Sequence, residues 1–421
     1  MNLKNIFKIT ILLIAILLIL AISTFINVYA AGNCAFSAGV GYGDVNMSTA
    51  IKKAATTYGT MGYSSYYATE TATYSTLNGY FSNGTRRLES DIVFLSGHGT
   101  SKQISTLLGQ GLIKGSKFGE SNYVGTEDIS WKNVKMAIFL ACQTGNGDDN
   151  LVYDVFRRSG WTTISMGWRQ DISQGSAKEW ISNFNSKLAT GANVDNSLSY
   201  ANGKSYSDSR VKDLSFYGPG GTVLKKQRAS SASNNGTSPI TIDESNVNKI
   251  YNKNFYYDGT EESKTNLIAA ITSINNSFKA EQYEINSYKI KNDGSYYTID
   301  FTYKEGEFYT NSSYTVIVED NYVTQIIDNT KNKDLVSIQS ETNFADDELI
   351  ETAKNAAKNE LETSNEISLF KQNFNNNIEI IGQEIRLFKD LEKNKNYIQI
   401  FTTYKFEENV ENACFEYMYE I

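Results

Sequence analysis

The only histidine of this 421-residue chain, His98, lies between two glycines directly after the apolar run IVFL. Cys142 follows a second apolar run, MAIFLA, further along the chain. A thiol becomes nucleophilic when a nearby base or cation favours the thiolate, and an imidazole can both do this and protonate a leaving amine. The two residues therefore predict nucleophilic catalysis of acyl transfer, provided that the fold brings them together.

The neighbouring glycines suit the same chemistry. Gly97 and Gly99 allow close approach of the backbone to a substrate, and the amides of Gly99 and Cys142 could form an oxyanion hole. Each reactive residue also has a plainer interpretation, because a cysteine after an apolar run is most often an inert buried thiol and a lone histidine is most often a loop residue. Their occurrence after two similar apolar runs favours a catalytic dyad.

Short apolar runs alternate with helical patterns around these residues, as in an α/β domain with a largely parallel sheet. Parallel neighbouring strands at 91–96 and 136–141 would bring His98 and Cys142 to the same sheet edge, where ligands bind in open α/β sheets. Residues 92–95 are all apolar, as in a strand covered on both faces. The pattern also predicts strands at 35–40, 65–69 and 162–166, a strand pair at 214–224, helices at 47–58, 151–158, 177–188 and 194–200, and a hairpin or flap at 101–130.

The motifs SGHG at 96–99 and LACQTG at 140–145 resemble those of the caspase-like (clan CD) cysteine peptidases. Within that group the resemblance is to the CHAT-domain branch, with gingipain- and clostripain-type peptidases as relatives. The segment WRQD at 168–171 and the run FYGPGG at 216–221 extend the resemblance, which spans residues 35–224. The chain departs from the family pattern at Leu140, where relatives commonly have serine, and at Pro219-Gly220, where they have an aspartate.

The resemblance implies a mostly parallel caspase-like sheet with helices on both faces, in which His98 is the general acid/base and Cys142 the nucleophile. It also implies that Trp168 and Asp171 contribute to substrate binding. A carboxylate at Asp171 would pair with Arg or Lys, so we expect cleavage after basic residues. The alternative is that Asp171 is a surface residue that caps the following helix.

Two further acidic residues, Asp148 and Asp149 in the run GNGDDN, are rival candidates for the specificity pocket or for calcium binding. A solvated loop is their plainer interpretation. The sequence contains neither a P-loop nor a Rossmann glycine pattern. We therefore expect no cofactor and no metal site, with calcium left open.

The first 30 residues are typical of a secretory signal peptide. Lys4 and Lys8 precede an unbroken apolar run at 11–22, and Val28 and Ala30 occupy the positions of small residues before a cleavage site. The alternative is an uncleaved anchor, because residues 9–26 nearly reach the length of a membrane span. We expect a secreted or cell-envelope protein that contacts a membrane only if this segment is retained.

The overall composition limits the partners. The formal charge of −8 and a pI near 5.1 argue against nucleic acid, so the expected partner is a protein or peptide substrate. Two prolines and many Asn, Ile, Lys and Tyr residues indicate an AT-rich bacterial genome. The three cysteines, Cys34, Cys142 and Cys414, are too few for a disulfide framework.

A linker at 225–240 is expected to follow the peptidase domain at 31–224, because it has no apolar pattern and is rich in Ser and Asn. Its basic residues, Lys225, Lys226 and Arg228, suggest self-cleavage that would release a C-terminal inhibitor or targeting arm; an ordinary basic linker is the plainer interpretation. An intramolecular contact between the two halves is left open.

The residue pattern of 241–421 predicts an α+β region of two small modules, 241–332 and 342–421. Each module is expected to be a helix followed by three antiparallel strands. We expect strands at 283–291, 296–303 and 314–318 in the first module, and at 378–388, 397–404 and 414–421 in the second. Asn292-Asp293-Gly294 is a strong hairpin turn.

These inferences together predict a secreted bacterial cysteine endopeptidase with a His98/Cys142 dyad. The alternative is a catalytically inactive caspase-like scaffold that acts as a cell-envelope binding protein.

Overall fold

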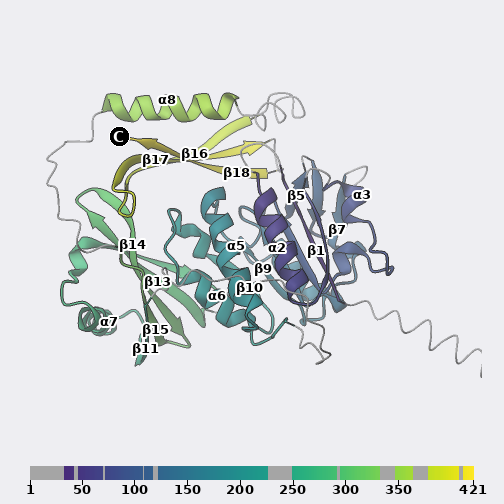
Figure 1. Ribbon diagram of the computed structural model, residues 1–421, viewed down its shortest axis with the longest axis horizontal. Helices are drawn as coiled ribbons and strands as arrows, with labels where there is room; N and C mark the ends of the chain where they lie inside the picture. The colour runs from purple at the N-terminus through teal and green to yellow at the C-terminus, as the bar shows by residue number, and fades with distance from the viewer. Residues whose placement is uncertain are drawn as a thin grey trace, which may run out of the picture.

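The computed structural model describes residues 33–41, 46–69, 72–107, 109–116, 122–225, 249–291, 294–331, 347–363, 378–406 and 411–421 (Figure 1). The predicted signal segment, Lys226 and Arg228 of the linker, and Asn292 and Asp293 of the hairpin turn lie outside these residues. Within the described part of the chain, no helix has the length and apolar character needed to cross a membrane.

A six-stranded, mostly parallel sheet organises the first half of the chain, with the order β10-β9-β8-β3-β1-β2. Its parallel strands are β1 (Cys34–Gly39), β2 (Ser64–Ala68), β3 (Ile92–Ser96), β8 (Met136–Leu140) and β9 (Ile164–Trp168). These strands confirm the predicted ones within a few residues. The strand pair predicted at 214–224 is wrong, because only β10 (Leu214–Tyr217) forms there, antiparallel to β9, and Val223 makes an isolated bridge to Asn193.

Helices cover both faces of this sheet. Successive side chains of a strand point to opposite faces, so an apolar strand such as β3 has side chains to bury on each face. Ile92 and Phe94 pack into one core with α2 (Ser48–Thr60), α5 (Gln174–Ala189) and α6 (Val194–Asn202). Val93 and Leu95 pack into a second core with α4 (Leu151–Arg158) and the short α3 (Tyr74–Leu77). The predicted helices of this half are therefore confirmed.

Among its described residues, the flap predicted after β3 contains four short strands: β4 (His98–Thr100), β5 (Gln103–Leu107), β6 (Gln110–Ile113) and β7 (Tyr123–Gly125). Ile104, Leu112 and Val124 anchor it in the second core. The flap thus begins at His98 and has a packed apolar side of its own.

The C-terminal region contains both predicted helices and all six predicted strands. The first module consists of α7 (Glu261–Ile274), β12 (Tyr283–Lys289), β13 (Tyr296–Glu305) and β14 (Phe308–Glu319), together with two strands that the sequence did not predict, β11 (Lys249–Tyr256) and β15 (Tyr322–Asp328). The second module is a helix followed by three strands: α8 (Asp347–Thr363), β16 (Ile378–Asp390), β17 (Lys395–Phe406) and β18 (Glu411–Glu420).

The C-terminal region packs directly against the first half. In Figure 1 the first module lies to the left and the parallel sheet to the right, with α8 and β16–β18 along the top. Ile317 of the first module and Phe401 of the second belong to the same hydrophobic core as α5 and α6. A buried ion pair, Lys212 Nζ to Asp300 Oδ2 at 2.7 Å, crosses the first interface.

A second, continuous sheet joins the modules to the flap. β14 pairs in parallel with β16, and β18 pairs antiparallel with β4, so the order runs β11-β15-β14-β16-β17-β18-β4-β5-β6-β7. The last strand of the chain therefore lies beside the strand that carries His98.

Candidate active site

Two neighbouring parallel strands position the histidine and the cysteine. β3 and β8 are paired so that Ser96 lies opposite Leu140. His98 and Cys142 each come two residues after this pair, so both emerge at the carboxyl edge of the sheet. They line one small cavity of about 30 Å³, together with Met47, Ser96, Gly97, Leu140, Ala141, Ile172, Gln174, Ala177 and Cys414.

A tight turn after β8 holds Cys142 in place. Gln143 adopts a left-handed backbone conformation with φ 57°, an uncommon state for a residue other than glycine, and its amide donates to the carbonyl of Gln170 at 3.1 Å. The hydroxyl of Thr144 donates to the carbonyl of Phe139 at 2.8 Å. A side chain at Gly145 would lie 2.7 Å from the carbonyl oxygen of Gly167. The run ACQTG is thus explained by the packing of this turn against β9.

The glycines beside His98 are required for packing within the protein. A side chain at Gly97 would collide with the carbonyl of Ser105 in β5. One at Gly99 would lie 2.8 Å from the carbonyl oxygen of Cys142. The space beside these glycines, which we expected a substrate to approach, is therefore filled by other parts of the chain. Gly99 and Cys142, the two residues of the predicted oxyanion hole, lie side by side.

Both predicted reactive side chains are buried. His98 is 3% exposed and Cys142 is 5% exposed. Burial raises the pKa of the Cys142 thiol well above its usual range, and the nearby Asp171 carboxylate acts in the same direction. The Sγ atom donates to the carbonyl of Ile172 at 3.8 Å. Burial therefore favours the neutral form of the Cys142 thiol at physiological pH.

Asp171 lies next to the cysteine turn. Its Oδ1 accepts a hydrogen bond from Gln143 Nε2 at 3.0 Å, and burial raises the pKa of its carboxyl group. The helix-cap alternative is wrong, because Ser173 is the N-cap of α5. The amide of Ser173 donates instead to Asp208 Oδ2 at 2.7 Å.

Trp168 does not line the cavity, and its predicted role in substrate binding is corrected. Its side chain has no exposed surface; Nε1 donates to the carbonyl of Val211 at 2.7 Å, and the ring packs edge-on against Trp180. The side chain belongs to the core between β9 and α5, because a large apolar ring on a covered strand is most stable there.

The rival acidic residues lie on the surface and do not line the cavity. Asp148 and Asp149 are both exposed, and Asp149 pairs with Lys102 at 3.0 Å and also with Lys114. Among the residues that the structure describes, no group of three or more His, Cys, Asp or Glu side chains is placed to hold a metal ion.

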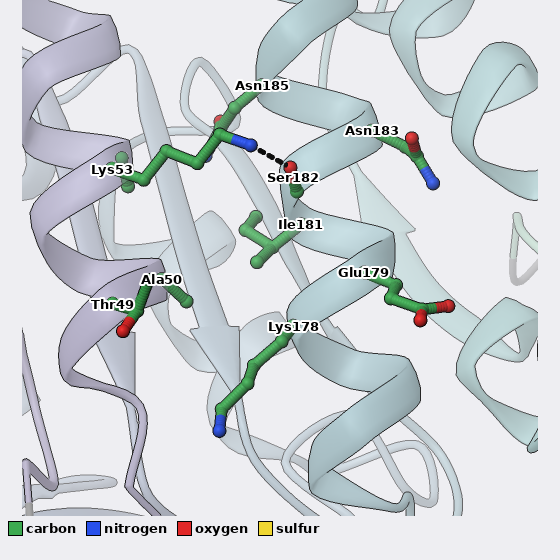
Figure 2. A pocket seen from close by; sticks show the side chains of 10 residues that line it. Thr49, Ala50, Lys53, Lys178, Glu179, Ile181, Ser182, Asn183 and Asn185 are labelled. Carbon is green, nitrogen blue, oxygen red and sulfur yellow. Dashed lines mark hydrogen bonds between the residues drawn. The ribbon is translucent and has the colours of Figure 1, made fainter.

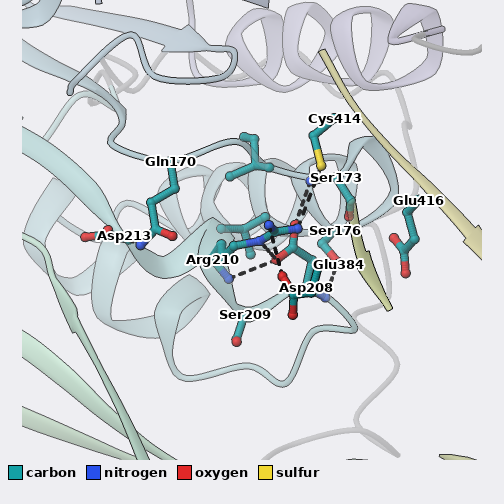
Figure 3. Close-up of polar contacts among 12 residues, drawn as sticks. Gln170, Ser173, Ser176, Asp208, Ser209, Arg210, Asp213, Glu384, Cys414 and Glu416 are labelled. Atoms are coloured by element: carbon teal, nitrogen blue, oxygen red, sulfur yellow. Dashed lines mark hydrogen bonds and ion pairs between the residues drawn. The ribbon is translucent and has the colours of Figure 1, made fainter. Parts of the chain in front are cut away.

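Three residues near the cavity were missed by the sequence analysis: Asp208, Arg210 and Cys414. Figure 3 shows Arg210 between the other two, with Nε 2.8 Å from Asp208 Oδ1 and Nη2 3.7 Å from Cys414 Sγ. Burial disfavours the charge of Arg210 and by itself would lower the pKa of the guanidinium. The Asp208 and Glu384 carboxylates outweigh this effect, so the pKa of Arg210 is raised. No local pattern could have found this cluster, because Cys414 lies 204 residues after Arg210 in the chain; the third cysteine was the only signal.

A larger cavity, of about 410 Å³, lies between α2 and α5 (Figure 2). Lys53 reaches across it and donates to the Ser182 hydroxyl at 2.6 Å. None of its lining residues is a histidine or a cysteine. We therefore assign the candidate site to the smaller cavity, which combines an imidazole with a thiol.

Comparisons with known proteins do not identify the site: no family model, curated protein or solved structure matches this chain.

Proposed function

We propose that this chain is a secreted cysteine endopeptidase of the caspase-like type that cleaves after Arg or Lys. The observation that carries the proposal is the meeting of the sole histidine of the chain with Cys142 in one cavity at the carboxyl ends of two neighbouring parallel strands. The secreted location comes from the N-terminal segment, which lies outside the described residues.

The proposed reaction begins when Cys142 Sγ attacks the carbonyl carbon of the peptide bond and its proton passes to His98. The amide of Gly99 and that of Cys142 stabilise the negative oxygen. His98 then protonates the leaving amine, and a thioester links the acyl group to Cys142. Water, deprotonated by His98, hydrolyses the thioester and regenerates the thiol.

Asp171 is the proposed determinant of specificity. It lies beside Cys142 and is partly buried, so its carboxylate would favour a basic side chain next to the cleaved bond. Asp208 adds a second carboxylate nearby, although Arg210 pairs with it in this structure. A basic substrate side chain therefore interacts mainly with Asp171.

The burial of Cys142 favours the second candidate, an inactive scaffold with an inert thiol. A thiol-directed peptidyl inhibitor with a terminal Arg separates the two. We expect prolonged incubation to label Cys142, and the substitution His98→Ala to slow labelling by about a hundredfold. The control Cys34→Ser, which removes a distant buried thiol, should leave the rate unchanged. Labelling of Cys142 that is indifferent to His98→Ala would support the scaffold.

A further inference from the structure

The C-terminal strand occupies the edge of the strand that carries His98. β4 pairs with β5 on one side, where Gly99 lies opposite Ile104, and with β18 on the other, where Gly99 lies opposite Asn412. Extended polypeptides commonly bind proteins by adding a strand to such an edge. β18 thus lies where a polypeptide substrate would add to β4.

A side chain of the same strand fills the space beside the nucleophile. Cys414 lines the cavity with His98 and Cys142 and is itself 3% exposed. Burial raises the pKa of Cys414 to about 12, so it presents a neutral thiol to Cys142. With this strand in place, neither reactive side chain is accessible to a polypeptide.

Polar and aromatic contacts hold the second module on this site. The guanidinium of Arg210 lies 4.5 Å from the ring centre of Phe401 in β17 and 3.5 Å from the carboxylate of Glu384 in β16. Arg386 Nη2 donates to the carbonyl of Ser207. Every strand of the module therefore contacts the 207–210 segment or the cavity.

We propose that β18 is a built-in blocking strand, which keeps Cys142 out of reach until the second module (α8 and β16–β18) moves away and a polypeptide takes its place beside β4. The inference rests on the proposed function, because blocking has a purpose only if Cys142 acts on a substrate. It assigns a specific role to the C-terminal region: regulation of access to the site.

The three cysteines of the unmodified protein provide the first test, since all are free and buried. Cys34 begins β1, at the amino ends of the parallel strands, and reports on that sheet itself. We expect iodoacetamide, in rising urea, to alkylate Cys142 and Cys414 together at a lower urea concentration than Cys34, as mass spectrometry of the peptides would detect. The proposal would be overturned if Cys142 became reactive only at the urea concentration at which Cys34 does. It would also be overturned if Cys142 reacted without urea as fast as in the unfolded chain.

Two substitutions provide the second test without urea. Asn412→Pro removes a backbone donor from β18, and Cys414→Trp places a side chain at position 414 that is far too large for the cavity of about 30 Å³. In either variant we expect Cys142 to be alkylated at least about tenfold faster than in the unmodified chain. The control Glu420→Gln breaks the exposed 2.8 Å ion pair with Lys395 at the far end of β18 and should not change the rate. Equal rates in all four proteins would refute the blocking role.

Hydrolysis of Arg- and Lys-containing peptides separates this inference from the proposed function. Faster alkylation in Asn412→Pro without hydrolysis of any peptide would support the blocking strand and reject the endopeptidase. Equal hydrolysis by the unmodified chain and by Asn412→Pro would support the endopeptidase and reject the blocking strand. If both proposals hold, the variant hydrolyses the peptides faster.

Discussion

Cys414 and Cys142 line one cavity, although Cys142 follows a strand of the parallel sheet and Cys414 belongs to the last strand of the chain. Each thiol is therefore buried partly by the other half of the protein. The pKa of both thiols is raised, chiefly by burial. The reactivity of Cys142 should accordingly depend on contacts made by the C-terminal region.

The pH dependence of alkylation follows from this burial. A raised pKa means that the folded chain retains the thiol proton to higher pH than an exposed cysteine, so the reactive thiolate of Cys142 should appear only above the usual value of 9.0. In Asn412→Pro we expect the midpoint to move to lower pH, because displacement of β18 exposes the thiol. Rates of iodoacetamide labelling across neutral and alkaline pH measure both midpoints. A midpoint below 9.0 in the unmodified chain would contradict the closed arrangement.

Substitution of Asp171 should change specificity. In Asp171→Asn, we expect the rate of Cys142 labelling by a peptidyl inhibitor with a terminal Arg to fall by about ten- to a hundredfold, because a charge-assisted hydrogen bond is lost. An inhibitor with a neutral terminal residue should be much less affected. Asp149→Asn is the matched control, since that side chain is exposed and paired with Lys102. Similar losses with both inhibitors would remove Asp171 from the specificity pocket.

Gly99 should be sensitive to the smallest side chain. Gly99→Ala would place a methyl group 2.8 Å from both the Ala141 side chain and the Cys142 carbonyl, so we expect a loss of about 1–3 kcal/mol in the free energy of unfolding. Gly59→Ala is the control, because that helical position in α2 has open space around it. It should stabilise the chain by about 0.5–1 kcal/mol. Urea unfolding measures both, and an unchanged free energy in Gly99→Ala would disprove the close packing.

The buried pair Lys212–Asp300 should be costly to break on one side only. Lys212→Met leaves the buried Asp300 carboxylate without its cation, so we expect a loss of about 3–5 kcal/mol in the free energy of unfolding at neutral pH. The double variant Lys212→Met/Asp300→Leu should recover most of this loss, since a well-packed apolar pair can replace a buried ion pair. A double variant that is no more stable than Lys212→Met would show that the uncompensated Asp300 carboxylate does not cause the loss.

The free energy of unfolding of the single variant Lys212→Met should depend on pH in a characteristic way. Burial raises the pKa of Asp300, and removal of Lys212 takes away the cation that opposes this effect. A carboxyl whose folded-state pKa is raised contributes its stability below its usual pKa of 3.8 and loses it as pH rises through the raised value. The destabilisation of Lys212→Met, relative to the unmodified chain, should therefore diminish as pH falls from neutral to mildly acidic. Urea unfolding at the two pH values provides the measurement.

The sequence by itself determined the elements whose signals are local. The apolar runs at 91–96 and 136–141 predicted β3 and β8, and the 3.6-residue periodicity of 177–188 predicted α5, because burial of one face or of both faces leaves its own pattern. The same reasoning identified His98 and Cys142 as a pair of interest, since both follow similar buried strands. It failed for Trp168, because a tryptophan beside a polar motif has the same sequence signature in a core as in a binding site.

Only the tertiary structure decided which distant segments meet. β11 and β15 have partly exposed faces and pair with one another far along the chain, so their local patterns are weak. The placement of Cys414 beside Cys142, and of Arg210 between Asp208 and Cys414, depends on how β18 pairs with β4. Such contacts depend on how whole modules pack together. The residue pattern within a single segment does not encode that packing.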